Sequence, residues 1–219
     1  MATSGKKKRR DAEEHFDAFV DWLEIHSRGV MYASIGLLVI AGGVWFWRQS
    51  NDRQAESAQT MLGEAESAVA SGNVPLAQSD LEKLIQRYGS TDAARQAHVV
   101  LAQVHYERGE YQQGIQELKP VTEDKDPYTA ASAMNLTAAG LEQSGKFAEA
   151  AAMYQTAARK APYRTDRDVY MASAARALTS AGELADAKKI WTELAKDDQS
   201  PANAEARVRL GELDAKAGV

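Results

Sequence analysis

The 219-residue sequence contains no cysteine, and this absence excludes disulfide scaffolds, zinc sites built on thiolates and cysteine nucleophiles. Aromatic residues make up only 7% of the chain and prolines number five, which favours closely packed helices over sheet sandwiches. An excess of positive charge is also missing, because the formal net charge is −5. A general nucleic-acid binder should be basic, so nucleic acid is not an expected partner. The 44% hydrophobic content predicts a folded chain, and the scarcity of aromatics and prolines makes all-α the expected class.

Motifs for catalysis and metal binding are missing as well. The sequence has no GxSxG segment and no glycine loop that could cradle a phosphate. His15 and His26 have no metal-ligand spacing, and His98 and His105 lie seven residues apart, about two helical turns, too far to share one ion. We therefore expect no metal, no cofactor and no small-molecule substrate, and we do not expect an enzyme.

One long uncharged run stands out near the N-terminus. Residues 29–47 contain no charged side chain, and as a helix they would extend roughly 28 Å, close to the thickness of a hydrocarbon core. Aromatic residues occupy both ends, where such rings prefer the headgroup level. We predict a transmembrane helix over 29–47 whose interface anchors are Tyr32, Trp45, Phe46 and Trp47.

Two other interpretations of this run are less favoured. A cleaved signal peptide should have a short leading region, whereas 28 residues precede this run. A buried core helix of this length would rarely lack charge on every face.

The distribution of basic residues predicts the orientation of the span. Residues 1–28 carry six Lys or Arg, whereas the twenty residues after the span carry only Arg48 and Arg53. We expect residues 1–28 to be cytoplasmic and residues 48–219 to be periplasmic, in a bacterial inner membrane. The residues that set this topology form a run of five: Lys6, Lys7, Lys8, Arg9 and Arg10.

Between the basic run and the span, residues 11–27 have apolar side chains at helical spacing, which predicts a short amphipathic helix. This helix could lie in the membrane interface or dock onto a partner protein, and the sequence does not separate the two.

The remainder of the chain has an internal period of 36 to 37 residues. Its markers are turn glycines and, seven residues before each, an alanine that keeps one helical position small. The glycines are Gly72, Gly109, Gly145 and Gly182, and the alanines are Ala65, Ala102, Ala138 and Ala175. A large residue follows nine positions after each glycine, at Leu81, Leu118, Tyr154 and Trp191, and prolines at 127, 162 and 201 mark the ends of units. The pattern predicts helix, turn, helix, stop.

These residues resemble the tetratricopeptide repeat, most clearly in the segment Gly145–Ala150, which reads GKFAEA. The resemblance implies an α-solenoid of about four helix pairs over residues 53–199, followed by a capping helix over 201–218. Stacked pairs would bury their apolar faces and form a groove for binding proteins. We expect Tyr154 and Trp191 to be packing residues rather than ligand contacts.

The whole layout resembles the bacterial YfgM-like inner-membrane proteins. That resemblance implies an ancillary subunit of the Sec translocon that works with periplasmic chaperones, with the membrane and other protein subunits as partners. A second hypothesis is a structural accessory subunit, or scaffold, of another large membrane assembly such as a respiratory or photosynthetic complex.

Overall fold

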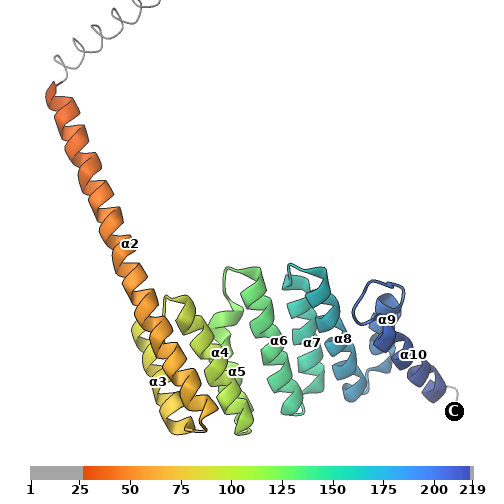
Figure 1. Cartoon of the computed structure of the whole chain (residues 1–219). Coiled ribbons are helices and arrows are strands. Elements are labelled where there is room, and N and C mark those ends of the chain that lie inside the picture. The colour runs from red at the N-terminus through yellow and green to blue at the C-terminus, as the bar shows by residue number, and fades with distance from the viewer. Residues whose placement is uncertain (1–26, 218–219) are drawn as a thin grey trace, which may run out of the picture. The chain divides into compact units, whose positions relative to one another are not determined.

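A computed structural model describes the backbone of residues 27–217, and within that range every regular element is an α-helix (Figure 1). The all-α prediction is therefore confirmed. The predicted basic run, the residues 11–26 of the predicted amphipathic helix and two of the histidines, His15 and His26, lie outside the described residues. The helices are α2 (Ser27–Ala70), α3 (Val74–Tyr88), α4 (Asp92–Glu107), α5 (Tyr111–Thr122), α6 (Pro127–Gln143), α7 (Phe147–Lys160), α8 (Arg164–Ala181), α9 (Leu184–Ala195) and α10 (Asn203–Ala217).

The chain divides into a first unit that ends at Arg53 and a second unit that begins at Gln54. Helix α2 contributes residues to both units and is continuous from Ser27 to Ala70. The described residues leave out several side chains between 27 and 35. Among those that are described, no helix is both long and apolar enough to cross a membrane.

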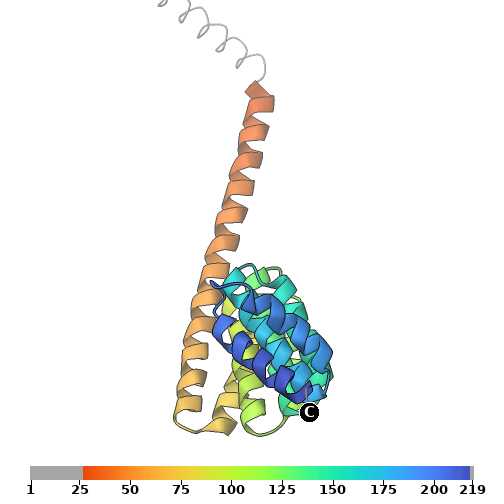
Figure 2. The same ribbon diagram turned by 90° about the vertical axis from the view of Figure 1, so that its right-hand side faces the viewer.

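The second unit is built from sequential helix pairs, as in tetratricopeptide repeats (Figures 1 and 2). Among the described residues the pairs are α4 with α5, α6 with α7, and α8 with α9, and each pair also packs on the next. Residues of α2 after Arg53 share an apolar cluster with α3 and α4, which completes a first pair. Helix α10 packs against α9 at the other end, so the predicted arrangement of sequential pairs is confirmed.

The four turn glycines all have a left-handed backbone, with φ between 75° and 83°. The residue after each glycine donates its N–H to the carbonyl five residues earlier, the bond that closes a Schellman cap. These bonds are Asn73 to Ala68 (2.9 Å), Glu110 to His105 (2.8 Å), Lys146 to Leu141 (2.9 Å) and Glu183 to Leu178 (2.9 Å). Because side chains with a Cβ rarely adopt this φ, glycine recurs at the same place in each unit. The second helix of each pair begins two residues after its glycine.

Small residues are buried where the two helices of a pair approach each other. Ala65, Ala102, Ala138 and Ala175 are each at most 1% exposed. The residue nine positions after each turn glycine is also buried: Leu81 and Leu118 are 0% exposed, Tyr154 is 5% exposed and Trp191 is 1% exposed. Short side chains therefore let the backbones come close, and the large side chains fill the remaining volume.

Tyr106 occupies a gap that two glycines leave open. Its hydroxyl donates a hydrogen bond to the carbonyl oxygen of Leu136 at 3.2 Å. A Cβ added at Gly114 or at Gly140 would overlap the Tyr106 ring. The ring thus joins α4, α5 and α6 through contacts that only glycine permits.

The burial of Tyr106 predicts a loss of stability at high pH. Burial raises the pKa of Tyr106 from 10.0 to about 12. Since the unfolded chain would release this proton at a lower pH than the folded chain, its contribution to stability is present below pH 10 and is lost as the pH rises toward 12. Chemical denaturation at several pH values should show this decline. In Tyr106→Phe the decline should be smaller, and an unchanged decline would contradict the assignment.

Candidate functional site: the first-helix face

Hollows lie along the face formed by the first helices of successive pairs. A cavity of about 450 Å³ is lined almost entirely by α4 and α6. Its lining residues are Asp92, Arg95, Gln96 and Val99 from α4, Tyr128, Thr129, Ser132 and Ala133 from α6, and Val121 from α5. Arg95 pairs with Asp92 and, at 3.2 Å, with Asp124, so this guanidinium is fixed at the rim.

A neighbouring hollow of about 520 Å³ continues this face toward α8. Tyr128 lines both hollows, and in the second it lies beside Tyr163, Thr165 and Asp166. The rings of Tyr128 and Tyr163 meet edge to face, with centroids 6.1 Å apart. They are 50% and 62% exposed, so this aromatic pair offers apolar surface to a partner.

A third cavity, of about 260 Å³, lies between the last pair and α10. Seven of its eight lining residues come from α6, α8 and α10, and the eighth is a tryptophan of α9. They are Glu142, Arg176, Thr179, Ser180, Arg209, Glu212, Leu213 and Trp191.

Ion pairs fix the charged side chains around this third cavity. Arg176 Nη1 donates to both carboxylate oxygens of Glu205, at 3.0 and 2.8 Å. The same carboxylate lies 3.6 Å from Arg209 Nε, and Arg209 Nη1 donates to Glu212 at 2.9 Å. Glu205 on α10 therefore holds the guanidiniums of both Arg176 and Arg209 in place.

The carboxylate of Glu142 is engaged by a tyrosine. The Tyr154 hydroxyl donates to Glu142 Oε2 at 3.0 Å. Burial, followed by this neighbouring negative charge, raises the pKa of Tyr154. Tyr154 is therefore a neutral donor at ordinary pH.

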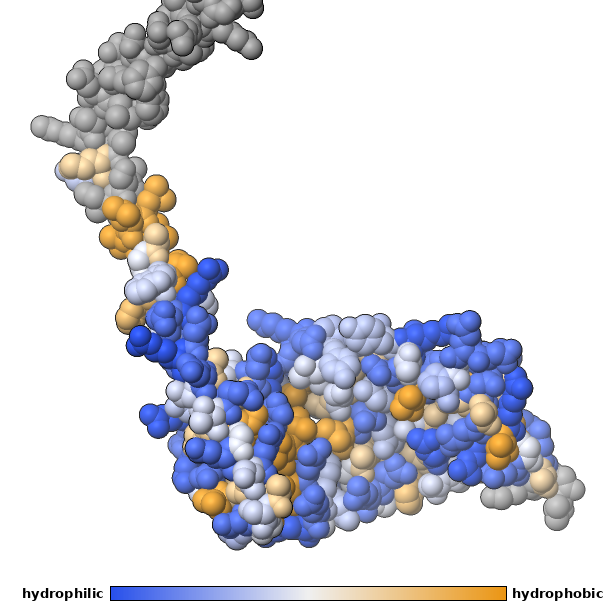
Figure 3. All heavy atoms as spheres, in the orientation of Figure 1, coloured by the Kyte–Doolittle hydropathy of each residue, from blue (hydrophilic) through white to orange (hydrophobic). Residues whose placement is uncertain are grey.

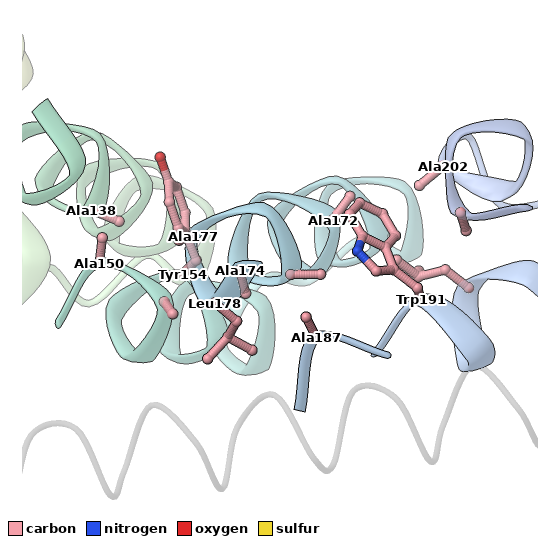
Figure 4. Packing of buried hydrophobic residues seen from close by; sticks show 14 of the residues in the cluster. Ala138, Ala150, Tyr154, Ala172, Ala174, Ala177, Leu178, Ala187, Trp191 and Ala202 are labelled. Atoms are coloured by element: carbon pink, nitrogen blue, oxygen red, sulfur yellow. The ribbon is translucent and has the colours of Figure 1, made fainter. Parts of the chain in front are cut away.

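Trp191 closes the floor of the cavity. Its ring is 1% exposed and belongs to an apolar cluster whose other members are mostly alanines, six of them from α8, α9 and α10. In Figure 4 the nitrogen edge of the indole is turned toward α8. Among the described residues Trp191 Nε1 has no hydrogen-bond partner, although this atom is buried.

The two described histidines each pair with a separate glutamate. His98 Nδ1 lies 3.0 Å from Glu117, and His105 Nδ1 lies 2.7 Å from Glu110. Across the residues that the structure describes, no three potential ligand side chains gather in a way that could hold a metal ion.

The predicted membrane anchors lie on the first part of α2. Tyr32, Trp45, Phe46 and Trp47 are 67%, 67%, 70% and 63% exposed. Leu37, Leu38, Val39 and Ile40 between them are 64% to 72% exposed, and Figure 3 shows apolar side chains gathered along this part of α2. Their role as interface anchors stays a prediction, as does the topology assigned to the basic run.

Sequence reasoning identified the repeat positions but missed the residues around the third cavity. Arg176, Glu205 and Arg209 belong to no motif. Arg176 and Glu205, which pair in the structure, lie 29 residues apart in the sequence. The signal that could have found them is the repeat itself, because side chains of successive first helices meet about 30 residues apart. Gln96 on α4 with Glu66 on α2 is a further such pair, at a separation of 30.

Comparisons with known proteins agree with this architecture. The family model described as a tetratricopeptide repeat-like domain matches residues 21–168, about two thirds of the chain. A crystal structure of nearly identical TPR-like repeats, from a kinesin light chain-like protein of Podospora anserina, aligns with a TM-score of 0.58. The alignment covers 75% of this chain and 88% of that one at 15% sequence identity, so it shows the fold alone. No curated protein matches the chain.

Proposed function

This chain belongs to the tetratricopeptide repeat-like domain family, and from that premise we propose that it is a membrane-anchored adaptor that binds other proteins through its solenoid. Repeat domains of this family are typically non-catalytic and bind proteins. The adaptor would be an ancillary subunit of a bacterial inner-membrane complex, with the solenoid in the periplasm.

The observation that carries the binding proposal is the series of hollows on the first-helix face. Their linings come from α4, α6, α8, α10 and Tyr163 just before α8, whereas the second helices contribute only Val121 and Trp191. Polar side chains such as Gln96 and Ser132 line these hollows together with the exposed rings of Tyr128 and Tyr163. A surface that combines aromatic area with amides and hydroxyls suits an extended polypeptide, because it can receive both side chains and main-chain polar groups.

The sequence supports the membrane anchor. Residues 29–47 are uncharged, and a helix of this length has about the thickness of a hydrocarbon core. In a bilayer the exposed apolar side chains of α2 would lose contact with water, and this transfer lowers the free energy. The basic run before the span supports a cytoplasmic N-terminus.

The resemblance to YfgM-like proteins supports the Sec translocon and periplasmic chaperones as the partners. Purification of the tagged full chain in mild detergent, followed by quantitative mass spectrometry, tests this assignment. Translocon subunits and chaperones at less than one copy per chain are the expected result. A fixed ratio to a respiratory or photosynthetic complex would replace the adaptor with a structural subunit, and the absence of any co-purifying protein would contradict both.

A single charge in the run should weaken the anchor. Leu38 lies at its centre, where aspartate costs about 2.5 to 3.5 kcal/mol on insertion. We expect Leu38→Asp to shift the full chain from the membrane pellet to the supernatant after an alkaline carbonate wash. The matched variant Leu38→Ile should stay in the pellet. If Leu38→Asp also stays there, the run does not anchor the chain.

A further inference from the structure

We infer that α10 pairs with α10 of a second copy of this chain, in antiparallel orientation, through an exposed apolar face. This outer face consists of Ala204, Val208, Gly211 and Ala215, which lie four, three and four positions apart. That spacing places the four residues on one side of a helix. All four are exposed, Val208 to 60%. The inference goes beyond the proposed function, since it concerns contacts between copies of the chain.

The repeat indicates that the outer face of α10 can receive a helix. A shift of 36 residues, the interval between units, relates this face to Asp168, Ala172, Ala175 and Thr179 of α8. Ala172 and Ala175, the equivalents of Val208 and Gly211, are 3% and 0% exposed. They belong to an apolar cluster that also contains side chains of α9 and α10. The corresponding face of α8 is therefore covered by other helices, whereas α10 is the last described helix of the row (Figures 1 and 2).

The composition of the outer face does not suit permanent contact with water. Terminal helices of solenoids carry a polar outer face, which keeps the end of the stack soluble. Here Val208 exposes a branched apolar side chain instead. Gly211 lies inside α10, where glycine is less favourable than alanine, although a Cβ at this position would meet no atom within 4 Å. No described neighbour requires this glycine, whereas a second helix packed closely against it would.

An antiparallel second copy matches the shape of the outer face. When Ala204 lies opposite Ala215 of the second copy, Val208 lies opposite Gly211 of that copy, because both pairs share one midpoint in the sequence. By two-fold symmetry, each valine side chain would fill the space above a glycine of the other copy. A parallel pair would instead set valine on valine and glycine on glycine, and the two glycines would leave a gap without van der Waals contacts.

The charges beside the outer face are complementary in the same arrangement. Arg207 and Asp214 lie on one flank of the face, and antiparallel pairing brings each of them near the other residue of the second copy. Their side chains are 61% and 60% exposed. Within one chain, Arg207 lies 2.6 Å from Asp198, and Asp214 lies 2.6 Å from Lys188. In the dimer these pairs would join into two rows of four charges that alternate in sign.

The outer face is short, so the dimer should be weak. From Ala204 to Ala215 the helix rises by roughly 16 Å, at about 1.5 Å per residue. Two helices in contact over this length bury less surface than a stable protein interface requires. The test therefore traps the dimer covalently instead of isolating it.

The test uses the full chain in mild detergent, with single cysteines introduced into a sequence that has none. Two versions of the chain carry tags of different size, one with Ala204→Cys and the other with Ala215→Cys. After mixing and mild oxidation, the expected result is a disulfide-linked dimer of the two versions and little dimer from either version alone. In the control, Lys189→Cys on α9 replaces Ala204→Cys. The Lys189 side chain is 77% exposed, yet this mixture should form far less dimer.

Charge reversal separates pairing from folding. Arg207→Asp and Asp214→Arg change exposed positions, where single ion pairs contribute little to the stability of the chain. Either reversal, placed in both cysteine versions, sets like charges opposite each other and should lower the yield of the disulfide dimer several-fold. When one version carries Arg207→Asp and the other carries Asp214→Arg, opposite charges face each other again in both rows, so the yield should recover.

Three results would overturn the inference. They are no dimer from the mixed versions, as much dimer from Ala204→Cys alone, which would indicate a parallel pair, and no recovery with the two reversals combined. If the mixed versions form no dimer while Val208→Asp lowers the recovery of a co-purified protein, the outer face binds a different protein and self-pairing is wrong. The mass spectrometry that tests the proposed function is a separate measurement, so either proposal can fail without the other.

Discussion

Replacing Trp191 with alanine is expected to lower the free energy of unfolding of the C-terminal pair by about 3 to 5 kcal/mol. The ring is 1% exposed and is the largest fully buried side chain among the described residues. Its neighbours in the apolar cluster include Ala172, Ala187 and Ala202, which are too short to fill the space it would leave (Figure 4). A cavity that cannot collapse adds its own cost to the lost burial.

Hydrogen exchange of the full chain in mild detergent is the measurement for this variant. In a solenoid each pair is stabilised by its neighbours, so exchange should accelerate most in α8, α9 and α10 and least in α3 and α4. The control is Trp191→Phe, which keeps most of the ring volume and removes the unpaired donor, so it should exchange far more slowly than the alanine variant. Equal acceleration along all helices would show that the terminal pair does not behave as a local unit.

Substituting Gly114 with alanine is expected to destabilise the middle of the solenoid by about 1 to 3 kcal/mol, the usual cost of overpacking a filled core. A Cβ at this position would overlap the ring of Tyr106, and it would lie 2.8 Å from the backbone carbonyl oxygen of Ala102. The ring cannot move away, because Gly140 bounds its other side. The backbone of α4 would have to shift.

The matched control is Gly211→Ala in α10. No atom lies within 4 Å of a Cβ at this position, so the added methyl group meets open space. Alanine forms helices better than glycine by about 1 kcal/mol, and the control should therefore be stabilised. The two variants, measured by chemical denaturation of the full chain, should change stability in opposite directions. A neutral Gly114→Ala would contradict the tight contact with Tyr106.

Much of the fold could be predicted from the period of the sequence. The turn glycines adopt the left-handed backbone because a Schellman cap requires it, and this requirement produces the spacing of 36 to 37 residues. The alanine seven positions before each glycine is small because a second helix packs there. These signals are local and recur four times, so the sequence displays them directly.

Other features depend on contacts that the sequence does not display. From the sequence, residues 48–51 could belong to a helix or to a linker, because their polar side chains suit both. In the structure they lie within α2. Gly114 lies five residues after its turn glycine, where the other units have Ala77, Ala150 and Ala187, and Gly140 lies inside α6. The reason for both glycines became visible only with Tyr106 between them. The cavity beside Trp191 depends on which arginine faces which glutamate, and composition carries no such information.

The central claim is that the first-helix face binds other proteins, and site-specific photo-crosslinking in living cells tests it most directly. A crosslinking side chain at Gln103 lies on the same side of α4 as Gln96 and Val99, which line a hollow, because the positions are four and seven residues apart. The control position is Gln116 on α5; both glutamines are exposed. The account predicts strong crosslinks to other proteins from position 103 and few from position 116. Crosslinks of equal strength from both positions, or none from position 103, would contradict it.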